Sequence, residues 1–203
     1  DIDRASSSCP KDLREVVRVC GITPPICASH DCPVVKAFSE AHPNDVGLQP
    51  EFNGSGQGND VSSAIDRVFK LYPKAKSFRS REFQDSSVIQ REVSRRGIQY
   101  DSNLCLYLQP DLAPLRLGIP GMTRFPVFWG DDIHWMQAGD EWELKKYLEA
   151  FLSPGLKILN VHPFIIAANA PSGDYYAKVK SHSATLTEKD MGTVRYPGAG
   201  ARS

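Results

Sequence analysis

The sequence predicts an α/β protein built around mostly parallel strands, in a sheet that is either open or closed into a barrel. Segments with apolar residues at helical spacing alternate about five times with short extended apolar segments. Proline, glycine or a helix-capping residue separates most of these segments. This alternation is typical of strand, helix and strand units, in which the strands run parallel.

The expected elements follow in order along the chain. Helices are indicated by stripes of apolar residues that begin at a proline or a capping residue and end at Gly or Pro. Strands are indicated by the short apolar segments between them, such as DVGLQ and LKILNVH. The expected helices cover 10–20, 33–41, 60–73, 86–97 and 142–151, and the expected strands lie within 22–29, 45–49, 75–80, 98–108, 123–129 and 156–162.

Composition limits the classes of function. The 203 residues fit one domain, 1–203, and the 24 basic and 24 acidic residues balance, so we expect no nucleic-acid partner. No apolar run is long enough to span a membrane, and no leader segment opens the chain. Five cysteines without a framework spacing indicate a reducing compartment, so we expect a cytoplasmic protein without disulfides.

The segment CASHDC places Cys27, His30 and Cys32 close together. A structural zinc site normally needs a second ligand pair at a set distance, and only Cys105 and scattered histidines are left to supply one. We therefore expect buried or inert cysteines here and no zinc, although an unrelated cysteine and histidine metal protein stays as an alternative. His30 and Asp31 are expected to face the mouth of the barrel.

Polar side chains follow nearly every expected strand. Ligands of parallel α/β proteins bind at the carboxyl ends of the strands, where these side chains would meet. Each one alone is most simply a loop residue, but together they indicate hydrolytic chemistry. They are Asp1, Asp3, His30, Asp31, Gln49, Glu51, Arg79, Arg81, Asp101, Asn103, Asp131, Asp132, His134 and His162.

Six segments carry a resemblance to a known family. DIDRAS, VGLQPEFNGS, PKAKSFRSRE, GIQYDSNL, VFWGDDIHW and ILNVHP, in this order, resemble the motifs of the polysaccharide deacetylase (NodB-homology) superfamily. The likeness is to its branch associated with bacterial surface-polysaccharide (O-antigen) gene clusters. It implies a deformed or incomplete (β/α) barrel that binds a divalent metal, normally zinc, and removes an acyl group from an amino sugar.

The resemblance also implies roles for single residues. Asp1 matches the catalytic base, Arg79 the arginine that orients it, Asp101 the acidic residue of the next motif, and His162 the acid that protonates the leaving amine. Metal ligands would come from Asp3, His134, Gln49 and Glu51. Sugar contacts would come from Asn53, Asp131, Asp132, Trp129 and Trp135, with simple packing as the alternative for both tryptophans.

The chain departs from the family pattern around the metal. Gln49 stands where the family has a histidine ligand, Glu51 where this branch has asparagine, and Arg81 where it has histidine. Losing imidazoles and gaining a cation both weaken metal binding, whereas a Glu51 oxygen offsets part of the loss. We therefore expect zinc to be weakly bound or absent.

Two readings of the family resemblance stay open. The chain is either a deacetylase with an altered metal site or a degenerate relative that binds glycan without hydrolysing it. It begins at Asp1 with no strand before it and ends at GAGARS with no closing helix. We therefore expect it to be trimmed at both ends.

Overall fold

The computed structural model describes residues 1–3, 5–6, 9, 21, 23–53, 60–139, 142–181, 184–187 and 189–202. The helix expected at 10–20 lies outside the described residues. Within them, the predicted α/β architecture with mostly parallel strands is confirmed.

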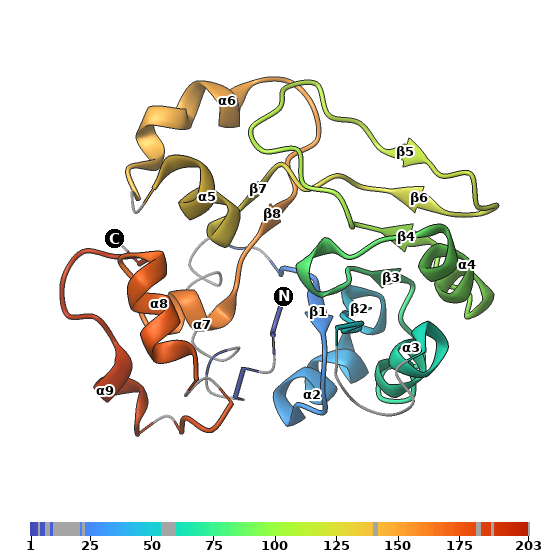
Figure 1. The fold of residues 1–203 in the computed structure, drawn as a ribbon, viewed down its shortest axis with the longest axis horizontal. Coiled ribbons are helices and arrows are strands. Elements are labelled where there is room, and N and C mark those ends of the chain that lie inside the picture. The colour runs from blue at the N-terminus through green and yellow to red at the C-terminus, as the bar shows by residue number, and fades with distance from the viewer. Residues whose placement is uncertain are drawn as a thin grey trace.

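Six strands form the main sheet, in the order β1-β2-β3-β4-β6-β5, and two more form a separate parallel pair, β7-β8 (Figure 1). Every pairing is parallel except that between β5 and β6. The strands are β1 (Ile26–Ala28), β2 (Val46–Leu48), β3 (Ser77–Phe78), β4 (Tyr100–Asp101), β5 (Leu115–Arg116), β6 (Thr123–Arg124), β7 (Trp129–Gly130) and β8 (Leu159–Asn160).

Irregular segments bridge the two sheets on both sides. The backbone nitrogen of Asp1 donates to the carbonyl of Val161, next to β8, and that of Ile2 donates to the carbonyl of Cys27 in β1. On the other side, an isolated parallel bridge joins Cys105 to Val127. Regular strand pairing therefore stops short of closure, and single contacts continue it as an incomplete barrel.

Helices connect the strands, and α3 (Val61–Phe69), α4 (Ser87–Arg95) and α8 (Gly173–Lys180) begin at a capping side chain. Asp60 accepts a hydrogen bond from Ser63 N at 2.6 Å, and Ser86 accepts one from Ile89 N at 3.2 Å. The α-helices are α2 (Pro33–Ala41), α3 (Val61–Phe69), α4 (Ser87–Arg95), α5 (Asp131–Ala138), α6 (Leu148–Leu152), α7 (Pro163–Ala167), α8 (Gly173–Lys180) and α9 (Met191–Val194). The 3-10 helices are η1 (Pro43–Asp45), η2 (Arg81–Phe83) and η3 (Leu144–Tyr147).

The main hydrophobic core lies between the first strands and the helices beside them. Leu48, Ile65 and Phe78 are fully buried in it, from β2, α3 and β3. Helices α2, α3 and α4 lie beside β1 to β4, whereas α5, α7 and α8 gather around β7 and β8 (Figure 1). None of the helices that the described residues form is long and apolar enough to cross a bilayer.

Candidate functional site

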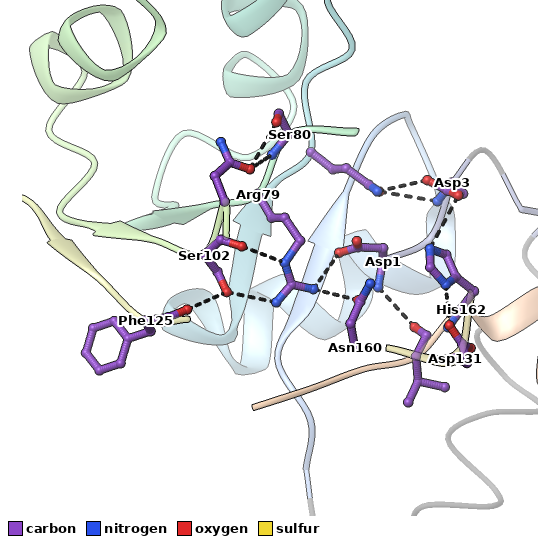
Figure 2. A network of polar contacts seen from close by, with 12 residues as sticks. Asp1, Asp3, Arg79, Ser80, Ser102, Phe125, Asp131, Asn160 and His162 are labelled. Carbon is purple, nitrogen blue, oxygen red and sulfur yellow. Dashed lines mark hydrogen bonds and ion pairs between the residues drawn. The ribbon is translucent and has the colours of Figure 1, made fainter. Parts of the chain in front are cut away.

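Arg79 is the centre of a polar network at the carboxyl end of β3 (Figure 2). Its Nη1 donates to Oδ1 of Asp1 at 3.1 Å and to Oδ1 of Asn160 at 2.6 Å. Its Nε and Nη2 donate to the carbonyl and hydroxyl of Ser102, at 3.2 Å and 2.9 Å. The guanidinium is only 6% exposed, so these partners fix its position. Arg79 thereby orients the Asp1 carboxylate.

His162 lies between two carboxylates. Its Nδ1 makes a hydrogen bond of 2.6 Å with Oδ1 of Asp131, and its backbone nitrogen donates to Oδ2 of the same residue at 2.7 Å. Its Nε2 faces Oδ2 of Asp3 at 3.6 Å. Burial alone would lower the pKa of His162, but the charge and hydrogen bond of Asp131, then the charges of Asp132 and Asp3, raise it above its ordinary value. The neighbouring carboxylates therefore favour the protonated form of the ring.

Asp3 is held by the glutamine that stands in place of a family histidine. Gln49 Nε2 donates to Oδ1 of Asp3 at 2.8 Å, and Gln49 Oε1 accepts from the backbone nitrogen of Asp3 at 3.3 Å. Asp3 has a φ of 42°, in the left-handed region that aspartate tolerates better than most residues. Gln49 is 1% exposed, and its amide is occupied on both sides by Asp3. It positions that carboxylate.

The described residues fit a divalent metal, with mostly oxygen donors. Oδ2 of Asp3 and Nε2 of His162 are too far apart for a hydrogen bond, at 3.6 Å, but close to the about 3.4 Å that separates two ligands of a tetrahedral zinc. One ligand atom each from Asp131, Asp132 and His162 also lie within 4.8 Å of one another. One imidazole among carboxylates is a poorer zinc site than a set with several histidines.

We expect Gln49→His to raise zinc or cobalt affinity by about tenfold or more, because it adds a nitrogen ligand and frees Oδ1 of Asp3. Arg81→His in addition should raise affinity further, since the charge of Arg81 opposes a divalent cation. Calorimetry on metal-free protein measures both. Removing Asp3 should abolish the gain, and unchanged affinity in Gln49→His would show that position 49 does not face a metal.

Glu51 and Asn53 lie with other partners. Glu51 Oε1 accepts from Arg81 Nη1 at 2.8 Å, so one oxygen of the proposed metal ligand is already paired with a cation. Asn53, proposed as a sugar contact, donates from Nδ2 to Glu82 at 3.0 Å on the surface. Neither of these two hydrogen bonds involves His162.

Asp101 lies in a buried ion pair beside the site. Its two oxygens accept from Nε and Nη2 of Arg124, at 2.5 Å and 2.9 Å, and Oδ1 also accepts from the backbone nitrogen of Asn103. Both side chains are buried, so removing one partner would leave a charge uncompensated in the interior. These contacts place Asp101 in a structural ion pair, and its catalytic role stays a prediction.

His134, Trp129 and Trp135 are directed into aromatic clusters. His134 is fully buried, makes a 2.7 Å hydrogen bond through Nδ1 with the hydroxyl of Tyr107, and packs against the rings of Trp129, Trp142 and Tyr147. Trp129 and Trp135 are 6% and 9% exposed, so little of either ring is available to a sugar. This burial favours the packing alternative for both tryptophans, and sugar contact stays a prediction.

The CASHDC segment is spread along the end of β1 and the start of α2. Cys27 is half-buried in β1 and Cys32 is buried, and the described cysteines, Cys9, Cys27, Cys32 and Cys105, are all free thiols. His30 Nδ1 lies 3.1 Å from the hydroxyl of Ser29, and Asp31 pairs with Lys36 on the surface.

Sequence reasoning missed three residues near the site. Ser102 and Asn160 hold Arg79, and their places at the ends of β4 and β8 were a signal that could have identified them. Nδ2 of Asn160 is buried without a hydrogen-bond partner among the described residues. Tyr176 on α8 lies near enough that burial, then the charges of Asp3 and Asp131, raise its pKa. Helix α8 has little amphipathic pattern, so it gave no signal.

Comparisons with known proteins show the family and the fold of this chain. A family model described as "WbmS-like: Polysaccharide deacetylase" matches residues 1–180. A solved structure from Bordetella bronchiseptica, described as a polysaccharide deacetylase involved in O-antigen biosynthesis (WbmS), has a TM-score of 0.85 and 24% identity. That likeness covers 100% of this chain and 84% of the other, and it supports the fold.

A second solved structure, described as a polysaccharide deacetylase from Mycobacterium smegmatis, is less similar. Its TM-score is 0.46 at 12% identity, over 93% of this chain and 77% of that chain, which is too weak to inform the fold. None of the curated proteins compared with the chain matches it significantly.

Proposed function

This chain belongs to the WbmS-like polysaccharide deacetylase family, and from that premise we propose that it hydrolyses the N-acyl group of an amino sugar in a surface glycan. The acyl group is most simply acetyl. The proposed setting is the reducing cytoplasm, in keeping with the described cysteines, which are free thiols.

One observation carries the proposal: a carboxylate and an imidazole suited to opposite proton transfers lie in one polar network. Asp1 is oriented by Arg79, and Asp131 holds His162 in a form that favours the imidazolium. Two titratable groups with such different environments are the usual arrangement for acid and base catalysis at neutral pH. The amino group of Asp1 donates to the carbonyl of Val161, the residue before His162, which brings the two groups together.

We assign separate roles in amide hydrolysis to the residues of the site. Asp1 accepts a proton from the water that attacks the acyl carbon, and Arg79 keeps its carboxylate in place. As the carbon–nitrogen bond breaks, His162 gives its proton to the amine, and the products are a free amino sugar and a carboxylic acid. Asp131 holds the ring so that Nε2 presents the proton.

We propose that carboxylate oxygens of Asp3 and Asp132 would hold a divalent metal. Asp132 belongs to a cluster with Asp131 and His162. When bound, the metal would polarise the acyl carbonyl and acidify a water molecule. His162 Nε2 cannot be a metal ligand and a proton donor at the same time. The proposal therefore assigns that nitrogen to proton transfer.

A glycan-binding relative without hydrolase activity is the second candidate. The observation that favours it is the amide of Gln49, which supplies no nitrogen ligand and is occupied by Asp3. Such a protein would keep the sugar contacts of the site while losing efficient metal-assisted hydrolysis.

The proposed activity is tested by incubating the protein with N-acetylated amino-sugar oligomers, after chelation and then with zinc, cobalt or manganese. Acetate and free amine are both measured, and we expect them to appear in equal amounts. Calorimetry with the same oligomers serves as the parallel readout. Binding without acetate release under every metal condition would support the glycan-binding candidate instead.

A further inference from the structure

A small cavity opens beside Asp3. Its volume is about 100 Å³, which is enough for a substituent of a sugar ring. Because Asp3 lines both the cavity and the proposed reaction site, a group bound here would belong to the reacting sugar or to its neighbour. The cavity is lined by Asp3, Ser29, Glu51, Ala64, Arg67 and Arg81.

The carboxylates in the cavity wall already have partners, whereas a guanidinium has donors to spare. Oδ1 of Asp3 accepts from Gln49, and Oε1 of Glu51 accepts from Arg81. Of the side-chain nitrogens of Arg81, Nη1 alone makes a hydrogen bond with the described part of the chain. Arg67, on α3, brings a second guanidinium to the same wall. The wall thus balances two carboxylates with two guanidinium groups, and the remaining nitrogens of Arg81 are the donors that it offers to a ligand.

The ion pair between Arg81 and Glu51 does not by itself explain these residues. Their side chains are 23% and 27% exposed, so water screens the pair and it adds little to stability. A guanidinium held in place by one carboxylate can bind a second one through its remaining nitrogens, since its planar fork matches carboxylate geometry. Glu51 thus orients Arg81 toward the cavity.

We infer that this cavity binds a carboxylate carried by the substrate, so that the glycan is built from acidic, N-acylated amino sugars. The inference rests on the proposed deacylation for the identity of the sugar, but the cavity and its charges are independent of catalysis. A carboxylate on the reacting ring would pin the sugar at Arg81 while its acyl group lies beside Asp1 and His162.

The test compares two oligomers of the same length, an N-acetylated aminohexuronic acid oligomer and its counterpart with the carboxyl groups reduced to alcohols. Calorimetry on the full chain carrying Asp1→Asn measures binding without turnover. We expect the acidic oligomer to bind about tenfold more tightly or better, because hydrogen bonds to charged groups contribute more than neutral ones. Arg81→Gln in the same background should remove the preference.

Arg91→Gln, which removes an exposed arginine on α4 away from the cavity, is the matched control and should leave the preference unchanged. An oligomer with a phosphate monoester in place of the carboxylate separates the two sources of an anionic group. Tighter binding of that oligomer would overturn the carboxylate assignment. Equal affinity for the acidic and reduced oligomers, or a preference that survives Arg81→Gln, would overturn the inference as a whole.

Failure of the inference is distinguishable from failure of the proposed function. If the protein with Asp1 intact releases acetate equally from both oligomers and binds them equally, deacylation stands and the carboxylate site does not. If neither oligomer loses acetate but the acidic one binds more tightly through Arg81, the carboxylate site stands and deacylation does not.

Discussion

Replacing Asp1 with asparagine is expected to reduce acyl release by about a thousandfold while leaving the fold intact. The amide can still accept the hydrogen bond that Arg79 Nη1 makes with Asp1 at 3.1 Å, but it cannot accept a proton from water. The kcat for acetate release measures the effect, and the melting temperature shows that the network around Arg79 persists.

Asp31→Asn is the matched control for Asp1→Asn. Asp31 follows β1, lies on the surface and pairs with Lys36 at 2.8 Å. We expect no change in kcat, because that carboxylate takes no part in the network around Arg79. An Asp1→Asn variant with near-normal activity would show that another group removes the proton.

Asp131→Asn is expected to reduce acyl release by about a hundredfold or more and to lower the pKa of His162. Burial of the ring lowers its pKa, and the charge and hydrogen bond of Asp131 contribute most to raising it. Without that carboxylate the ring should be neutral at pH 7 and no longer have a proton to donate. The imidazole signals in a proton NMR titration of metal-free protein measure the pKa directly.

Asp132→Asn serves as the control, because Asp132 acts on His162 only through its charge and makes no hydrogen bond with the ring. Its effect on the pKa of His162 should have the same sign and be smaller. If the two variants shift the titration equally, the 2.6 Å hydrogen bond with Asp131 is not the cause of the raised pKa.

The raised pKa of His162 also links stability to pH. A group whose pKa is higher in the folded state stabilises that state fully below its unfolded pKa, about 6.5 for histidine, and loses this contribution as pH rises through the folded pKa. The stability difference between the parent and Asp131→Asn should therefore be larger near about pH 6 than near about pH 9. Denaturant unfolding at both pH values measures it.

Local signals were enough to predict much of the fold. Pro33 at the first helical position and the apolar stripe behind it gave the bounds of α2, 33–41, as the structure has them. Asp60 and Ser86 likewise marked the starts of α3 and α4. These features depend on neighbours within one helical turn, so a single sequence contains them.

Other helices lacked such signals. The segment that forms α5 begins with two aspartates and ends in a weak apolar pattern, so its start was interpreted as a strand end. That error affects function, because α5 directs His134 into an aromatic cluster and presents Asp131 to His162. The helix at 142–151 was predicted as one element and is divided into η3 and α6.

The pairing of side chains within the site could not be predicted from the sequence. Strand ends identified Asp1, Arg79 and His162 as candidates, but nothing local indicates that Gln49 binds Asp3 or that Asp101 binds Arg124. The choice depends on how neighbouring strands place their last residues, which follows from the register of the whole sheet.

The network around Arg79 has a consequence for folding. Arg79 lies 78 positions along the chain from Asp1 and 81 positions from Asn160, and the contact between Asp1 and Val161 spans 160 positions. Contacts between residues so distant along the chain form slowly, because closing the long loop between them costs conformational entropy. The first helices and strands can therefore pack before the site forms. A local opening between β8 and residues 1–2 would disrupt the site without unfolding β1 to β4. Catalytic competence is therefore expected to be the last property gained on refolding and the first one lost under mild denaturation.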